Sequence, residues 1–81
     1  MDETDYSTTD FYTTAVLLFS GFDVTQITSH GPKGEVKRFH FENTPELQAI
    51  VMEYMNGKLT GNIRQFRNAI DTVKDMLHSG Q

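Results

Sequence analysis

Three histidines are the first residues to consider for chemistry, because an imidazole can bind a metal ion or transfer a proton near neutral pH. They are His30, His40 and His78. None has another histidine at a spacing of one, three or four residues, whereas a catalytic zinc ion needs three converging ligands. We therefore expect no metal site. His40 is expected on the solvent-facing side of a strand, and His78 at a helix C-terminus, where a protonated imidazole is favourable.

Other residue types used in catalysis lack the required patterns. Glu42 and Glu46 are close in sequence, but Glu46 is better explained as an acid in the first turn of a helix. Ser20 lacks the Gly-x-Ser-x-Gly pattern, and the glycine-rich turn at residues 31–34 does not join a strand to a helix as a phosphate-binding loop does. A chain of 81 residues with a filled core leaves little room for a pocket of ~300 Å³. We expect no enzyme, no cofactor and no small-molecule substrate.

The charge of the chain is unevenly distributed around a formal net value of −4. Residues 1–23 contain five acidic side chains and no lysine or arginine. Six basic side chains form two groups, with Lys33, Lys37 and Arg38 on an expected hairpin and Lys58, Arg64 and Arg67 around the start of the last helix. If the groups converge, they form a patch able to contact phosphates. Nucleic-acid binding, with single strands or RNA favoured, is therefore an alternative function, which the overall acidity and the lack of a reader motif disfavour.

Protein interaction is the function that we favour from the sequence. A two-stranded hairpin has unpaired edges that can add a strand from a partner or a second copy. Its expected outer face contains Val36, Arg38 and His40. The first helix is apolar over much of its surface, including Tyr12, Val16 and Leu17, and one small core does not consume all of that surface. These six residues are the candidate interface.

The expected hairpin contains the strand around which the other elements are arranged. In residues 35–42, Phe39 and Phe41 alternate with polar side chains, a pattern typical of a strand with one buried face. Residues 22–29 predict the partner strand. Val24 and Ile27 cannot share one face of a regular strand, so we expect a bulge near Thr25 or Gln26. Residues 30–34 supply the turn, because they combine proline with two glycines.

Three helices are expected around this hairpin. The first, at about residues 8–20, follows a capping-box spacing from Ser7 to Asp10. The second begins after Thr44, with Pro45 at the first helical position, where the missing amide costs nothing, and ends near residues 56–57. The third covers residues 63–78 and follows a second capping pattern that starts at Asn62.

Together these elements predict a single small α+β domain of order α-β-β-α-α, with a β-hairpin packed on three helices. Residues 1–6 are expected to be a flexible acidic tail, residues 7–78 the domain, and residues 79–81 a frayed C-terminus. The acidic N-terminus, the absence of cysteine and the lack of a long apolar run favour a cytoplasmic protein. The expected core consists of Phe11, Leu18, Val24, Ile27, Phe39, Phe41, Leu47, Ile50, Val51, Tyr54, Phe66, Ile70 and Val73.

Four segments also resemble a known family. They are Ala-Val-Leu-Leu-Phe-Ser-Gly-Phe in the first helix, Phe-His-Phe-Glu at the end of the hairpin, Thr-Pro-Glu-Leu with Tyr-Met-Asn-Gly in the second helix, and Phe-Arg-Asn-Ala-Ile-Asp-Thr-Val-Lys in the third. Over about residues 9–77 the chain resembles a small family of bacterial and phage proteins known only as a domain of unknown function. The resemblance implies an accessory protein of a bacterium, phage or mobile element, and it carries no catalytic positions.

Overall fold

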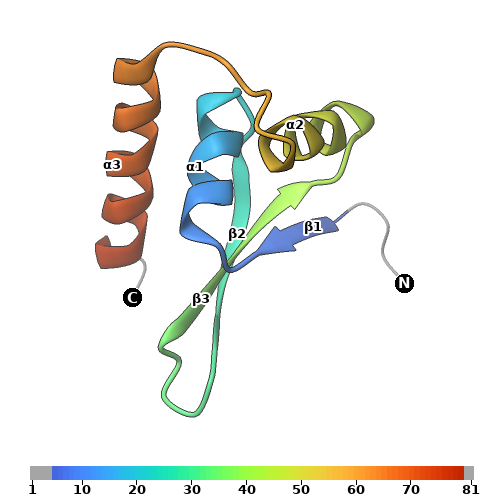
Figure 1. The fold of residues 1–81 in the computed structure, drawn as a ribbon. Helices are drawn as coiled ribbons and strands as arrows, with labels where there is room; N and C mark the ends of the chain where they lie inside the picture. The colour runs from blue at the N-terminus through green and yellow to red at the C-terminus, as the bar shows by residue number, and fades with distance from the viewer. Residues whose placement is uncertain (1–4, 80–81) are drawn as a thin grey trace.

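The computed structural model describes residues 5–79, and it contains three strands and three helices within that range (Figure 1). In chain order they are β1 (Asp5–Thr8), α1 (Phe11–Phe19), β2 (Val24–His30), β3 (Val36–Glu42), α2 (Pro45–Met55) and α3 (Ile63–Ser79). The α+β class is confirmed. The predicted order lacked the short strand β1.

The sheet is antiparallel and has the strand order β1-β3-β2, so β3 lies in its centre. Phe41 is aligned with Tyr6 of β1 and with Val24 of β2, and Phe39 is aligned with Ile27. Both phenylalanines are buried, with exposed fractions of 2% and 1% for Phe39 and Phe41. The alternation predicted for β3 is therefore confirmed, and this face of the sheet supports the core.

The predicted bulge in β2 is also confirmed. The register between β2 and β3 shifts between Val24 and Gln26, which leaves Thr25 as the extra residue. The Thr25 hydroxyl donates a hydrogen bond to the backbone oxygen of His40 at 3.1 Å. Because of the bulge, Val24 and Ile27 both align with a buried phenylalanine of β3, and each packs against the core.

The strand β1 corrects the sequence-based expectation for the N-terminal region. Asp5 and Tyr6 belong to β1 rather than to a tail, and residues 1–4 lie outside the described range. Ser7 is also in the strand, so the helix cap is Asp10, whose side chain accepts a hydrogen bond from the amide of Thr13 at 2.8 Å. Consequently α1 begins at Phe11 rather than near residue 8.

The caps of the other two helices are confirmed. The hydroxyl of Thr44 accepts a hydrogen bond from the Leu47 amide at 3.1 Å, with Pro45 at the first position of α2. The Asn62 side chain accepts one from the Gln65 amide at 3.0 Å before α3. The helix α1 packs against both α2 and α3 and lies between them (Figure 1). The buried core residues are Ala15, Leu17, Phe39, Phe41, Leu47, Val51, Ala69 and Val73.

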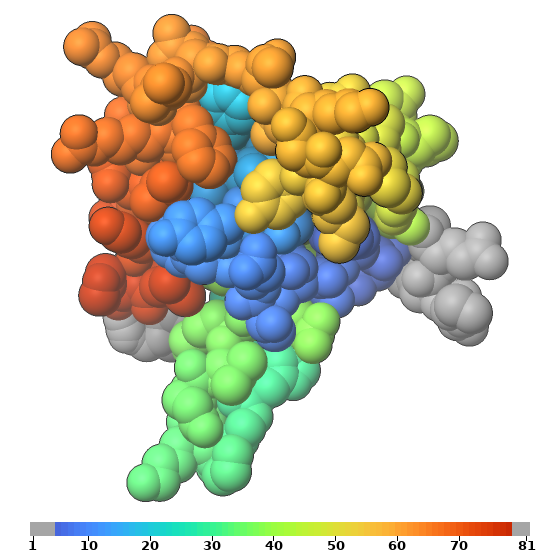
Figure 2. Space-filling model, in the orientation of Figure 1, coloured from blue at the N-terminus to red at the C-terminus, as the bar shows by residue number. Residues whose placement is uncertain are grey.

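The hairpin tip, defined as residues 30–36, extends away from the helices (Figures 1 and 2). Gly31 and Gly34 adopt positive φ angles of 93° and 67°, and the Gly34 amide donates to the Gly31 oxygen at 3.1 Å. These conformations favour glycine, as the sequence predicted. Figure 1 shows that the hairpin tip and the start of α3 lie at opposite ends of the molecule.

Candidate functional site

An apolar groove lies where the end of α1, the α2–α3 connection and the first turn of α3 meet. Its volume is about 340 Å³, and its main apolar lining is Val16, Phe19, Tyr54, Leu59, Ile63 and Phe66. Figure 2 shows the blue-to-cyan surface of α1 between the yellow-to-orange surface of α2 with the connection and the orange-to-red surface of α3. The sequence-based expectation that so short a chain leaves little room for a hollow of this size was wrong.

Phe19 builds one wall of the apolar groove. Its ring meets Phe66 edge-on, with 5.7 Å between centroids and an interplanar angle of 88°. A Cβ atom at position 61 would overlap the same ring, so any larger residue there would require the Phe19 ring or the connection to shift. Phe19 at the end of α1 thus contacts both the α2–α3 connection and α3. The groove lies between α1, this connection and the first turn of α3.

The same end of the molecule exposes large apolar side chains. Ile63 lines the groove and is nevertheless 85% exposed, and Met55 near the end of α2 is 74% exposed. Met52, three residues before Met55, is exposed as well. Because such a side chain is normally covered in a small protein, Ile63 marks the groove as a candidate interaction surface. The sequence-based interface did not include these three residues.

Three basic side chains adjoin groove residues in the sequence, as does one acidic side chain, Glu53, which precedes Tyr54. Lys58 lies between two groove residues in the connection, and Arg64 and Arg67 each follow a groove residue on α3. Residues 56–67 contain these three basic side chains and no aspartate or glutamate. One acidic side chain, that of Asp10, caps the other end of α1. A negative charge, that of Asp10, therefore lies at the start of α1, and the three positive charges lie next to groove residues near its end.

Of the six predicted interface residues, two are buried. Val16 and Leu17 have no appreciable exposure, which corrects their placement on the surface. Leu17 belongs to the core, because α1 is covered by the sheet and by both other helices, whereas Val16 forms part of the groove floor. Tyr12 is 54% exposed, and Val36 on the hairpin is also exposed. Tyr12 lies one turn before Val16 on the same face of α1.

The two basic groups predicted for nucleic-acid binding do not come together. Lys33, Lys37 and Arg38 belong to the hairpin, whereas Lys58, Arg64 and Arg67 lie at the end of the molecule where α3 begins (Figure 1). In addition, Lys37 donates to the Ser29 hydroxyl at 2.8 Å, and Arg38 donates to the Ser7 hydroxyl at 3.2 Å. The single patch on which that alternative depended is not formed.

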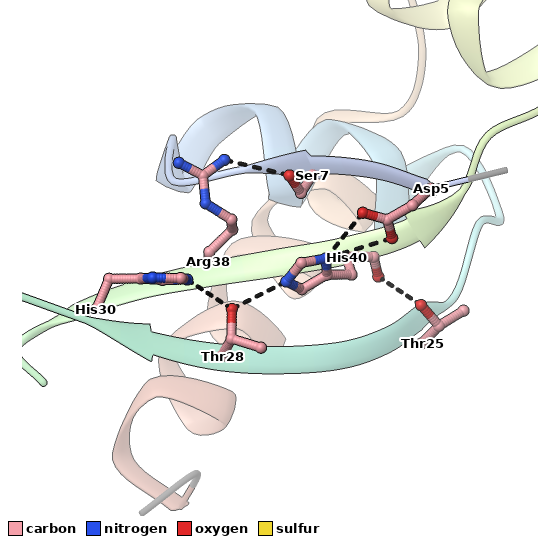
Figure 3. A network of polar contacts seen from close by, with 7 residues as sticks. All are labelled: Asp5, Ser7, Thr25, Thr28, His30, Arg38 and His40. Carbon is pink, nitrogen blue, oxygen red and sulfur yellow. Dashed lines mark hydrogen bonds and ion pairs between the residues drawn. The ribbon is translucent and has the colours of Figure 1, made fainter. Parts of the chain in front are cut away.

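Arg38 and His40, the remaining predicted interface residues, lie on the outer face of the sheet within a polar network (Figure 3). His40 Nδ1 is 3.1 Å from the Asp5 carboxylate, and His40 Nε2 is 2.9 Å from the Thr28 hydroxyl. The same hydroxyl is 2.8 Å from His30 Nε2. An ionised carboxylate only accepts hydrogen bonds, so Nδ1 carries the proton of a neutral His40, and Thr28 donates to Nε2. Thr28 then accepts from His30.

This order of carboxylate, imidazole and hydroxyl also occurs in hydrolytic triads. Here, however, the hydroxyl of Thr28 lies on the open face of the sheet and is shared with a second imidazole (Figure 3). It lines neither the apolar groove nor the smaller hollow beside Gly21 and Glu42. The network therefore joins β1, β3 and β2 across the sheet. Within residues 5–79, no three His, Asp or Glu side chains are grouped to hold a metal ion.

Tyr6 is the one described residue whose ionisation is clearly perturbed. Partial burial beside Phe41 raises the pKa of the Tyr6 hydroxyl above its ordinary value of 10.0, and the negative charge of Asp10 raises it further. Both effects favour the neutral phenol. Tyr6 therefore remains neutral at neutral pH, and its side chain packs against the core.

The fold and these surfaces define a small α+β protein in which helices cover one face of a three-stranded antiparallel sheet and leave an apolar groove open. The chain belongs to a family described as a domain of unknown function (DUF5659), whose model matches residues 3–79. No curated protein and no solved structure matches it. Over the described residues, no helix is both long enough and apolar enough to cross a membrane.

Proposed function

We propose that this protein is a non-enzymatic interaction module that associates with a second copy of itself through the apolar groove. The proposal includes the cytoplasmic location and the role as an accessory protein of a bacterium, phage or mobile element expected from the sequence. The observation that carries it is the exposed apolar surface around the groove, above all Ile63 at 85% exposure. Burying such surface in a contact between proteins is favourable.

A second copy is favoured as the partner because the chain carries both halves of a charge-complementary pair. Lys58, Arg64 and Arg67 each adjoin a groove residue in the sequence, whereas Asp10, the exposed N-cap of α1, lies at the far end of that helix from the groove. Opposite charges on two surfaces guide and orient association. The hairpin edge is a weaker candidate, since β1 already pairs with β3 and only β2 of the hairpin lies at an edge of the sheet.

Sedimentation velocity over a range of protein concentrations tests this function. The wild-type chain is expected to change from monomer to dimer as its concentration rises, and Ile63→Ser is expected to remain monomeric over the same range. Val36→Ser is the matched control, because Val36 is also an exposed β-branched residue but lies on the hairpin. A wild-type chain that is monomeric at every concentration would contradict the proposal. Loss of the dimer in Val36→Ser alone would assign association to the hairpin.

A further inference from the structure

We infer that two copies associate about a twofold axis so that Tyr12 of each copy enters the apolar groove of the other. This inference rests on the proposed function and specifies its interface. It depends on three features of one face of the molecule: an exposed aromatic side chain, a hollow lined by apolar groups, and charges of opposite sign at the two ends.

The apolar residues that α1 contributes to this face form a single row. Tyr12, Val16 and Phe19 are spaced at i, i+4 and i+7, which places them along one side of the helix. Val16 and Phe19 line the groove, whereas Tyr12 stands one turn outside it and is 54% exposed. A projecting group and a receiving hollow are therefore neighbours on the same face, separated along the axis of α1.

This arrangement suits a twofold contact. When two identical faces meet with their α1 helices antiparallel, the exposed Tyr12 of each copy is brought over the hollow of the other. The contact is then made twice, as in an isologous interface, where residue i meets j and j meets i. The site is incomplete in a single copy, because the ring that fills each groove comes from the partner.

Tyr12 has the properties of an anchor residue. Its ring meets Phe11 edge-on, with centroids 5.1 Å apart and an interplanar angle of 87°. The neighbouring ring supports one orientation, so less side-chain freedom is lost on association. Tyrosine gives a large contact area with few rotatable bonds, and it is enriched among residues that dominate interface energies.

The charges favour the antiparallel orientation. Asp10, two residues before Tyr12, is exposed at the start of α1, and Lys58, Arg64 and Arg67 are exposed next to groove residues near its end. Antiparallel docking places Asp10 of one copy near the basic end of the other, whereas parallel docking would bring the basic ends together. Like charges in close approach are unfavourable, so the charge pattern favours the antiparallel orientation over the parallel one.

Three sets of variants test the interface by sedimentation equilibrium of the full chain. Tyr12→Ala is expected to weaken the dimer by about thirtyfold or more, the effect of removing an anchor residue. The double variant Lys58→Glu with Arg64→Glu is expected to weaken it by about tenfold. Circular dichroism and thermal unfolding establish that each variant is folded. Val36→Ser, outside the interface, is expected to retain the wild-type dissociation constant.

Mixing two defective variants tests the reciprocity. A Tyr12→Ala copy retains an intact groove, and an Ile63→Ser copy retains Tyr12. Their heterodimer therefore contains one complete Tyr12–groove contact, and it is expected to form more strongly than either variant associates with itself. If the heterodimer has an affinity no higher than that of either homodimer, the twofold contact is overturned.

A measurement on the wild-type chain needs no substitution. Dilution should shift the NMR signals of the Tyr12 ring and the Ile63 methyl groups together, while those of Val36 stay constant. A dimer in which neither signal moves, or which survives Tyr12→Ala unchanged, overturns this interface and leaves the proposed self-association standing. A chain that stays monomeric overturns both. Growth beyond a dimer overturns the closed twofold arrangement.

Discussion

At the residue scale, Phe41 shows how strongly one side chain supports the fold. It lies in the central strand, aligned with Tyr6 on one side and Val24 on the other, and it is 1% exposed. Phe41→Ala is expected to lower the free energy of unfolding by about 3 to 5 kcal/mol, because it removes the buried ring and leaves a cavity. Urea unfolding measures the change. A loss under about 1 kcal/mol would contradict the central position of this ring.

Tyr6 predicts a pH dependence of stability in the alkaline range. Burial and Asp10 raise its pKa in the folded state, so the folded chain retains the phenolic proton more strongly than the unfolded chain. Its contribution is fully present below the ordinary pKa of 10.0 and is lost as the pH rises through the raised value. The unfolding free energy of the wild type should therefore fall more steeply above pH 10.0 than that of Tyr6→Phe. If the unfolding free energy falls equally with pH in the wild type and in Tyr6→Phe, Tyr6 does not cause the alkaline loss of stability.

The sequence identified individual residues best where a local pattern determines their environment. The alternation around His40 predicted that Phe39 and Phe41 are buried, and the spacing of Val24 and Ile27 predicted the bulge. Ile63 is different, because helical periodicity shows which side of α3 is apolar but not where the covering layer ends. The first turn of α3 extends past that layer, so an apolar residue at that position remains exposed.

At the scale of elements, β1 was the segment that sequence reasoning missed. Asp5, Ser7 and Thr8 are polar, so the segment has no apolar alternation to indicate a strand. Its conformation comes from pairing with β3 and from two cross-strand contacts, Asp5 with His40 and Ser7 with Arg38. Such long-range partners are not visible in a local window of sequence.

The polar network predicts that His40 holds β1 on the sheet. His40→Ala removes the contacts to Asp5 and Thr28, each worth about 0.5 to 1.5 kcal/mol. Faster hydrogen exchange is expected at the amides of β1, which depend most on this contact. His30→Ala is the matched control, because His30 touches Thr28 but is remote from β1 along the network. Equal exchange in the two variants would argue against this role of His40.

The α2–α3 connection predicts a specific sensitivity at Gly61. Gly61→Ala places a methyl group against the Phe19 ring, which Phe66 holds from another side. The ring or the connection must move, at an expected cost of about 1 to 3 kcal/mol in unfolding free energy. Thr60→Ala, at the neighbouring exposed position, should change stability by less than about 0.5 kcal/mol. Thermal and urea unfolding compare the two variants, and equal stability would show that Phe19 yields without strain.

At the scale of the whole molecule, the groove depends on how three separate segments meet. The sequence predicted that α1 carries more apolar surface than one core consumes, and Tyr12 and Val16 are part of the proposed face. The sequence did not predict that the α2–α3 connection lies over Phe19. The contact joins Gly61 to a residue far away in the sequence, and no local pattern indicates it. The same limitation applies to the basic residues, whose grouping along the sequence did not reveal that the hairpin and α3 point to opposite ends (Figure 1).

Self-association through the groove predicts that the thermal stability of the molecule depends on its concentration. Because the dimer forms only from folded chains, mass action favours folding as the concentration rises. Above the dissociation constant, a hundredfold increase adds about 1.4 kcal/mol per chain, half of RT ln 100, and this raises the Tm of a domain of this size by several degrees. Calorimetry at two concentrations measures the shift. Ile63→Ser should unfold at one Tm regardless of concentration, and a concentration-independent Tm for the wild type would contradict a dimer that is coupled to folding.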